Sequence, residues 1–424
     1  MYYIERVTVE GFWGDRTLDF GFNEDVNFII GINGSGKTTA INIVVAALTA
    51  NFSELDRLEF SKITIRLTSS QNRKKPSIII NKNQGINSAF PSIDYQIRYS
   101  ASDKPINISL DTYEEQMMLR RYPRHIVEHE FYRRNAHSAT KFLSELVNIS
   151  WLSVNRSSQI IDENDRNESS VDRKLKELSD RLVRYFSVLG KKASEEFESF
   201  QKEVFLSLLF KKSSKPFFSA AKELEIDKEK EALRGIFSQF KLTPKDFQTR
   251  INSHFDALEK AKEKLNSENV GLSTTDISVL IGSERIEYIV DEWAKSISKR
   301  DDIFEPRDTF LKIINSMMQR KHFSINSQNE IQITTQSGKN LSIYKLSSGE
   351  KQLLIVLGEA LLQEKQPWVY IADEPELSLH VRWQESLVEN LRNLNPNAQI
   401  IFATHSPDVV SIFGDKIFDM EDML

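Results

Sequence analysis

Eight residues near the start of the chain have the types and the spacing of a phosphate-binding loop. Residues 31–38 read Gly-Ile-Asn-Gly-Ser-Gly-Lys-Thr, a complete Walker A motif. Its glycines let backbone N–H groups turn toward phosphate oxygens, and a helix N-terminus adds positive partial charge. We expect Lys37 to reach the outer phosphates and the Thr38 hydroxyl to bind Mg²⁺. The nucleotide-binding residues predicted here are Asn33, Gly34, Ser35, Gly36, Lys37, Thr38 and Thr39.

The segments on either side of this loop support that interpretation. Residues 26–30 form an apolar run typical of a buried strand. Residues 39–48 contain neither glycine nor proline, so they can continue as a helix. The order strand, glycine-rich loop, helix is the context that a P-loop requires.

Two adjacent carboxylates near the other end of the chain could complete the chemistry. Residues 368–372 read as an apolar strand, and Asp373 and Glu374 follow it. Neighbouring side chains on a strand point to opposite faces, so the two acids can do different jobs. We expect Asp373 to accept the hydration shell of Mg²⁺, and Glu374 to orient and deprotonate an attacking water.

Three further motifs carry a resemblance to a known family. Residues 346–350, Leu-Ser-Ser-Gly-Glu, follow a predicted strand and open a predicted helix, an arrangement that favours an anion. This turn resembles the signature motif of ABC-type ATPases. Residues 377–380 resemble the D-loop, and His405, after the next strand, resembles the switch histidine.

Within the ABC-type ATPases the chain is similar to the branch that contains SMC, RecF and OLD-family proteins. In that branch the P-loop begins the chain, an insertion separates it from the signature, and Walker B reads like Asp-Glu-Pro-Glu. The resemblance covers roughly residues 1–160 and 320–424. The size is similar to stand-alone ATPase subunits of bacterial anti-phage systems such as PARIS and Septu.

This resemblance implies a mechanism and a set of partners. ATP and Mg²⁺ are the implied cofactors, and two heads would face each other head to tail in a dimer or a higher homo-oligomer. Ser347 and Gly349 of one head would close over ATP held by the other, and His405 would sense the γ-phosphate. The best candidate for the family's glutamine loop, which completes the Mg²⁺ shell, is Gln159. The implied catalytic residues are thus Glu374, His405 and Lys37, and the metal ligands are Thr38, Asp373 and Gln159.

The implied fold class is α/β: a P-loop NTPase head of ABC type with an antiparallel β subdomain and a helical insertion. We expect an N-terminal lobe over residues 1–160, the insertion over 161–320 and a C-terminal lobe over 321–424. The insertion is a candidate oligomerisation, sensor or effector-docking region. It shows no heptad pattern sustained enough for a long coiled coil.

Hydrophobic periodicity predicts the other elements. Short strands at 63–67, 78–81 and 93–99 are expected to be antiparallel. A turn at 11–15, a hairpin of 331–334 with 341–344 and a helix over 381–394 are also expected. The other predicted strands are 2–9, 18–22, 151–154 and 399–403, and the other predicted helices are 112–148, 171–210, 244–265 and 350–364.

The predicted helix over 112–148 is rich in basic residues, among them Arg120 and Arg134. It is either a phosphate-binding or partner-binding surface, or an ordinary solvated helix face. His125 and His129 have a spacing that suits a metal ion, but no acidic third ligand stands at a suitable distance in the sequence.

Composition limits the remaining possibilities. The 424 residues carry a net charge of −5 and no cysteine, which excludes disulfides, thiolate catalysis and cysteine-bound zinc. The first residues do not form a signal peptide, and no run approaches the ~18 apolar residues of a membrane span. We therefore expect a cytoplasmic protein without a membrane partner.

Two functions fit these features. The first is a defence ATPase that self-assembles and controls a separate toxic effector, such as a nuclease, because no nuclease motif is visible in the chain itself. The second is a RecF-like repair ATPase whose heads clamp duplex DNA, although the acidic net charge counts against DNA as a partner. A nucleotide-locked scaffold with little turnover is compatible with the first.

Overall fold

The expected α/β class is confirmed, with antiparallel and parallel sheets in the same chain. The computed structural model describes residues 1–69, 73–83, 92–108, 139–153, 169–209, 226–239, 243–267, 271–410 and 413–423. The chain divides into two units. The first, which we call the head, comprises Met1–Arg184 and Arg307–Leu424, and the second comprises Tyr185–Pro306.

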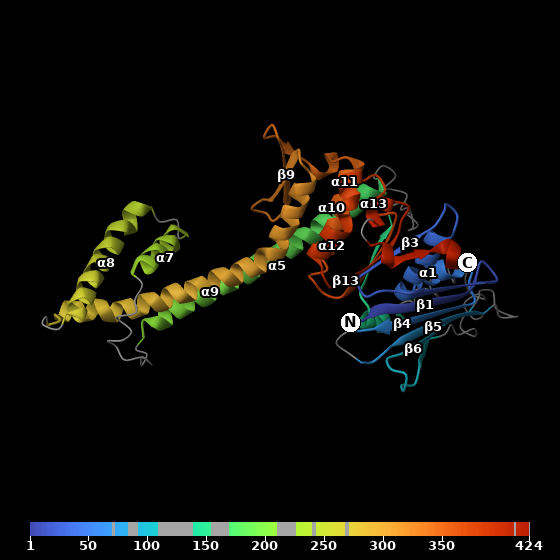
Figure 1. The fold of residues 1–424 in the computed structure, drawn as a ribbon, viewed down its shortest axis with the longest axis horizontal. Coiled ribbons are helices and arrows are strands. Elements are labelled where there is room, and N and C mark those ends of the chain that lie inside the picture. Colours follow the sequence, from blue (N-terminus) through green and yellow to red (C-terminus); the bar gives the residue numbers. More distant parts are fainter. Residues whose placement is uncertain are drawn as a thin grey trace, which may run out of the picture. The chain divides into compact units, whose positions relative to one another are not determined.

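An antiparallel sheet of six strands lies in the N-terminal part of the head (Figure 1). The short strands expected to be antiparallel are confirmed as members of it. In spatial order it contains β2 (Arg16–Gly21), β1 (Tyr3–Phe12), β4 (Lys62–Thr68), β5 (Ser77–Asn83), β6 (Ser92–Arg98) and β7 (Ile106–Ile108).

A parallel sheet of five strands forms the second layer of the head. Its strands come from distant parts of the sequence, and all its pairings are parallel. In spatial order they are β14 (Ile417–Asp419), β3 (Val26–Ile30), β13 (Ala398–Ala403), β12 (Trp368–Asp373) and β8 (Ile149–Ser153).

Helix α1 (Lys37–Thr49) shares one hydrophobic core with both sheets. Its buried residues extend around most of its circumference, which is typical of a helix covered on all sides. The Tyr95 hydroxyl of β6 donates to the Ala47 carbonyl of α1 at 2.9 Å. From the parallel sheet, Ile371 and Ile401 enter the same core. The helix that follows the P-loop is therefore fixed between two sheets.

The opposite face of the parallel sheet carries aromatic side chains. Phe402 packs against Phe28 and Tyr370, with ring centroids 6.5 and 6.0 Å apart. The Tyr370 hydroxyl donates to the Val356 carbonyl at 3.2 Å, which ties β12 to α10 (Ser348–Leu361). Alternation along β12 thus serves two cores, one on each face.

A small three-stranded sheet precedes α10. It contains β9 (Lys321–Ile325), β10 (Ile331–Thr335) and β11 (Asn340–Leu341). The expected hairpin is present, but its second strand has only two residues. The expected strand residues Ile343 and Tyr344 lie in a 3-10 helix, Ile343–Lys345, which the Ser342 side chain caps. The signature turn therefore follows a helical turn rather than a strand.

Two other boundaries differ from the prediction. The helix expected over 381–394 is split into α11 (Val381–Glu385) and α12 (Leu387–Leu394) by Ser386, whose ψ of 1° leaves the helical region. Gly11 and Phe12, expected in a turn, extend β1 through a bulge, and the chain turns at residues 13–15. The remaining short helices are α2 (Phe52–Arg57), α13 (Pro407–Val410), Gly414–Lys416 and α14 (Met420–Met423).

The described part of the insertion is mainly helical, and two of its helices lie close to the predicted ranges 171–210 and 244–265. The helices of the insertion are α5 (Ser170–Ser207, 38 residues), α7 (Ile226–Gln239), α8 (Pro244–Asn266) and α9 (Thr274–Met317, 44 residues). The buried positions Leu175, Leu178, Leu182, Tyr185 and Leu189 of α5 keep the 3-4 spacing of a heptad. This run covers only residues 175–189, which is shorter than the sustained pattern of a long coiled coil.

Within the second unit, α5 and α9 run antiparallel (Figure 1). Phe200 packs against Trp293 with ring centroids 5.0 Å apart, and Lys299 pairs with Glu196 at 3.0 Å. Helices α7 and α8 share a separate core around Phe255. In the part of the chain that the structure describes, no helix is long and apolar enough to cross a bilayer.

We predict that Gln399→Leu lowers the free energy of unfolding by about 3 kcal/mol. Gln399 of β13 is fully buried, and its amide bonds both backbone groups of Ile4 in β1 at 2.8 Å. Leucine would leave those groups buried without partners. Urea unfolding measures the change, with Gln328→Leu on an exposed turn as the control. Equal stability of the two variants would contradict this role.

Candidate nucleotide site

The P-loop, the two adjacent acids and His405 meet at one edge of the parallel sheet. Strands β3, β13 and β12 are neighbours and run in the same direction, so their carboxyl ends lie side by side. The P-loop follows β3, His405 follows β13, and Asp373 ends β12. Ligands of open α/β sheets bind outside the carboxyl ends of the strands.

Glycine is required at the turns of the P-loop. Gly31, Gly34 and Gly36 have φ values of 147°, 85° and 95°, a region that other residues rarely adopt. Gly36 is also the N-cap of α1, and a Cβ there would lie 2.9 Å from the Trp13 ring. The loop therefore turns tightly enough for α1 to begin at Lys37.

Lys37 is held inside the loop. Its side chain is 5% exposed, and its Nζ donates to the carbonyls of Gly31 at 2.9 Å and Ile32 at 3.1 Å. Burial lowers the pKa of Lys37, while the nearby carboxylates of Glu374 and Asp373 act in the opposite direction. The ammonium group thus lies at the centre of the loop, within the field of both acids.

The Thr38 hydroxyl donates to Asp373 Oδ1 at 3.2 Å, although the two residues are 335 positions apart. A hydroxyl and a carboxylate are the hard oxygen donors that Mg²⁺ prefers. Among the described residues, no group of three or more His, Cys, Asp or Glu side chains could hold a metal. The chemistry of this hydroxyl and carboxylate therefore fits a Mg²⁺ ion.

Glu374 lies beyond the strand rather than on it, which corrects the expected alternation with Asp373. Strand β12 ends at Asp373, and Glu374 has a φ of 50°. Its N–H donates to the Ala403 carbonyl at 2.8 Å, which fixes this unusual backbone. Glu374 Oε1 lies 3.9 Å from His405 Nε2, so the turn brings two predicted catalytic side chains together.

The signature turn lies against the D-loop of the same chain. Ser347 is the N-cap of α10 and forms a capping box with Glu350. A Cβ at Gly349 would lie 2.3 Å from the Ser378 carbonyl oxygen. The glycine is thus needed for backbone packing within one chain, independently of its predicted contact with ATP held by a second copy.

Glu350 connects this turn to β9. Its carboxylate accepts the Ser347 N–H at 2.8 Å and pairs with Lys321. Burial disfavours the charged form, but the hydrogen bonds from Lys321 and Ser347 are sufficient to lower the pKa of Glu350. The N-terminus of α10 is therefore held by an ionised carboxylate.

Sequence reasoning missed two residues at this edge. Trp13 stacks on Phe12 with centroids 4.7 Å apart, beside Gly36, and 39% of Trp13 is exposed. Glu376 is buried and accepts hydrogen bonds from Thr404 and His405. Trp13 belongs to no motif that we recognised, and Glu376, the last residue of Asp-Glu-Pro-Glu, was given no role of its own.

Some predicted residues lie outside the described part of the chain. These are Gln159 and the basic stretch with its arginines and histidines. Of the predicted helix 112–148, residues 139–148 are described; residues 139–146 are helical, and residues 147 and 148 are not. Asn33, Gly34 and Ser35 lie in the P-loop, and Thr39 lies in the first turn of α1.

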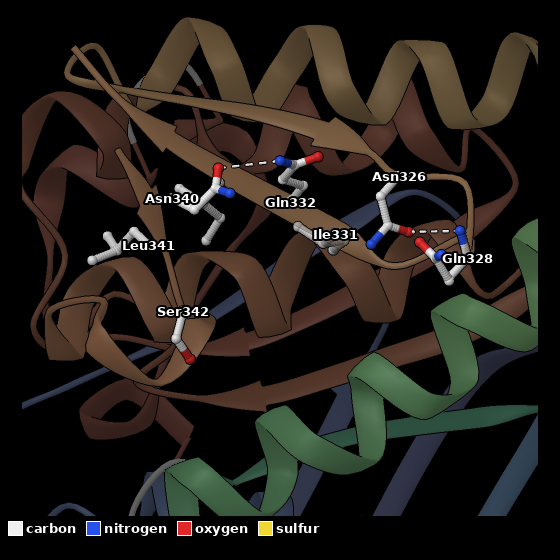
Figure 2. Close-up of a pocket in the computed structure, with 8 residues that line it drawn as sticks. Asn326, Gln328, Ile331, Gln332, Asn340, Leu341 and Ser342 are labelled. Atoms are coloured by element: carbon white, nitrogen blue, oxygen red, sulfur yellow. Dashed lines mark hydrogen bonds between the residues drawn. The ribbon is translucent and has the colours of Figure 1, made fainter. Parts of the chain in front are cut away.

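A pocket of about 490 Å³ lies on the three-stranded sheet (Figure 2). Amide side chains dominate it, and Gln332 donates to Asn340 at 3.1 Å across two strands. Asn326 and Gln328 line one end of it. Its lining contains none of the predicted nucleotide-binding residues, so it is distinct from the site at the P-loop.

Comparisons with known proteins agree with this geometry. The family described as "AAA domain, putative AbiEii toxin, Type IV TA system" matches residues 26–411. The chain belongs to this family. The predicted ATPase class is thereby confirmed, and the family description also names a Type IV TA system.

Individual relatives match over short segments. The Retron Vc95 probable ATPase of Vibrio cholerae serotype O1 biovar El Tor is 36% identical over 86 residues, which are 18% of this chain and 17% of that protein. The Retron Ec83 probable ATPase of Escherichia coli is 31% identical over 88 residues, 18% and 16% of the two chains. The matched segments therefore span less than a fifth of each relative.

Among solved structures, the chain is similar to an Smc head domain with an extended coiled coil from Pyrococcus furiosus. That protein is bound to the C-terminal domain of ScpA. The TM-score is 0.46 at 14% identity, and the alignment covers 97% of this chain and 92% of the other.

We predict that Gly349→Ala lowers the free energy of unfolding by about 1–3 kcal/mol, because the added methyl group would overlap the Ser378 carbonyl. Chemical unfolding measures this. Gly190→Ala is the matched control, since a Cβ at Gly190 of α5 meets nothing within 4 Å. Equal stability of both variants would mean that the D-loop does not need the glycine.

Proposed function

We propose that the chain binds and hydrolyses ATP at sites shared between two copies, and that this cycle controls a separate toxic effector in anti-phage defence. The observation that carries the ATPase part is the convergence at one sheet edge of Lys37, Thr38, Asp373, Glu374 and His405. These side chains supply the charges and hydroxyl that phosphoryl transfer to water uses.

Each residue has a role that follows from its position. Lys37 and the P-loop N–H groups would bind the β- and γ-phosphates. Thr38 and Asp373 would hold Mg²⁺, which would supply positive charge to the phosphates. Glu374 accepts a proton from the attacking water. His405 lies 3.9 Å from Glu374 and would contact the γ-phosphate of a bound nucleotide.

The proposal of a shared site is supported by the exposure of the signature turn. Ser347 is exposed at the N-terminus of α10, a 14-residue helix whose first N–H groups can donate to an anion. Leu377 in the adjacent D-loop is also exposed. A second copy arranged head to tail would place this surface over the P-loop, so assembly would depend on ATP.

The defence role is supported by the retron ATPases among the relatives and by the toxin system in the family description. The head has residues for ATP chemistry, and we assign the toxic reaction to a partner such as a nuclease. The RecF-like alternative depends on the basic stretch that lies outside the described residues. Salt-sensitive binding of duplex DNA that is lost when these arginines are replaced would favour that alternative.

We predict that Lys37→Ala weakens ATP binding by at least ~100-fold, because the phosphates lose their buried cation. Glu374→Gln should keep ATP affinity but lower turnover by about 10²–10⁴-fold. A fluorescent ATP analogue and phosphate release measure the two effects. Lys339→Ala, on an exposed turn, is the control. Unchanged turnover of Glu374→Gln would exclude Glu374 as the base.

We predict that two inactive variants restore activity when they are mixed. Lys37→Ala removes one P-loop, and Ser347→Arg blocks one signature turn. A head-to-tail pair of the two variants retains one complete site, formed by the P-loop of the Ser347→Arg chain and the signature of the Lys37→Ala chain. At most about a quarter of the wild-type turnover per chain is expected, because half of the pairs are mixed and each has one site of two.

Each variant measured alone at the same total concentration is the control for this mixture. Mixed protein that stays as inactive as the separate variants would contradict shared sites. Full turnover by Ser347→Arg alone would also contradict them, because each chain would then complete its own site.

A further inference from the structure

Glu376 is a buried acid in the loop between β12 and α11. It is 7% exposed, and its Oε1 accepts hydrogen bonds from the Thr404 hydroxyl and from the His405 N–H at 3.2 Å. Its Oε2 has no hydrogen-bond partner among the described residues. Burial raises the pKa of Glu376, and the charge of Glu374 acts in the same direction.

The bonds of Glu376 belong to a closed network between two loops. Thr404 Oγ1 accepts the Ser406 N–H at 2.9 Å, and the Ser406 hydroxyl donates to Gln384 Oε1 at 2.7 Å. Gln384 Nε2 donates to the Leu379 carbonyl of the D-loop at 2.9 Å, which closes the network. The loop that follows β12 and the loop that follows β13 are therefore joined by side chains at both ends.

This network is costly as a purely structural device. A buried carboxylate loses its hydration, and an apolar group of similar volume usually provides comparable stability. What an apolar group cannot do is accept the His405 N–H. The acid thus fixes the backbone from which the His405 side chain extends toward Glu374.

We propose that Glu376 is a positioning residue for ATP hydrolysis, which holds His405 beside Glu374. This inference rests on the proposed function, because it assigns a role within the same site. Glu376 itself touches neither the nucleotide nor the water. It acts through the 3.9 Å separation of His405 Nε2 and Glu374 Oε1, which its two hydrogen bonds maintain.

The same loop links this pair to the signature turn. Ser378, two residues after Glu376, has a φ of 70°, and its carbonyl lies where a Cβ of Gly349 would stand. Movement of α10 would therefore displace the backbone near Glu376. Through the hydrogen bonds of Glu376, it would also shift His405. Contact between two heads at the signature turn would thus alter the position of His405 relative to Glu374.

The test compares ATP affinity with turnover in full-length protein. Glu376→Ala removes both hydrogen bonds and should lower kcat by about 10–100-fold, as misplacement of reacting groups by ~1 Å does. ATP affinity should stay within about twofold, because the P-loop is untouched. Glu376→Gln keeps a carbonyl oxygen for Thr404 and His405, so it should recover most of the lost turnover.

Two other variants complete the experiment. Thr404→Val removes the hydrogen bond to Glu376 and the one from the Ser406 N–H with little change in volume, and should lower kcat in the same direction. Its kcat is the deciding measurement if Glu376→Ala does not fold. Glu385→Ala removes an exposed acid on α11 and should turn over like the wild type.

Three outcomes would overturn the inference. The first is wild-type kcat in folded Glu376→Ala or, should that variant not fold, in Thr404→Val. The second is Glu376→Gln that is as inactive as Glu376→Ala, which would mean that the charge and not the acceptor matters. The third, absence of turnover in the wild type, would overturn the proposed function as well, so the two failures are distinguishable.

Discussion

The parallel pairing of β3, β13 and β12 is the constraint on which the site depends. Because these strands point the same way, the P-loop lies at the same edge as two loops that follow it by more than 330 residues in sequence. The hydrogen bond between Thr38 and Asp373 is the direct result. Burial of α1 in a core shared by both sheets then fixes the helix N-terminus toward the same edge. A register shift in this sheet would separate the P-loop from its acids.

The second physical feature is how the insertion begins. The first turns of α5 pack on α10, the helix that starts at the signature. Lys351 pairs with Asp172 at 2.7 Å, and Arg181 pairs with Glu359 at 2.8 Å. Both pairs are partly buried, so solvent screens them less than it screens surface ion pairs. The signature helix and the start of the insertion therefore behave as one packed element within the head.

Local chemistry explains what the sequence could predict. The P-loop, its helix and the acid-terminated strand are each encoded within about ten residues, and the structure places them as expected. The antiparallel order of the N-terminal strands also followed from short apolar runs. The predicted ends of helices and strands were wrong where a polar side chain caps the element. Ser342, for example, caps a 3-10 helix where β character had been expected.

Non-local contacts explain what the sequence could not show. Glu376 meets Thr404 and His405 only after two strands have paired, so nothing near it in sequence indicates a buried acid. The close approach of Ser378 to Gly349 is likewise a tertiary effect. The pairing of α5 with α9 was hidden by the many charged residues between the apolar positions. Local patterns thus predicted the residues that carry the chemistry better than they predicted the tertiary contacts that position them.

The central claim is that ATP is hydrolysed at sites completed by a second copy of the chain. The most direct measurement is ATP turnover per chain over a wide range of protein concentration, with and without duplex DNA and with the effector absent. The account predicts turnover per chain that rises with concentration and then levels off, and that does not respond to DNA. Turnover that is constant from the most dilute sample upward would contradict shared sites, and strong stimulation by DNA would favour a repair-type clamp.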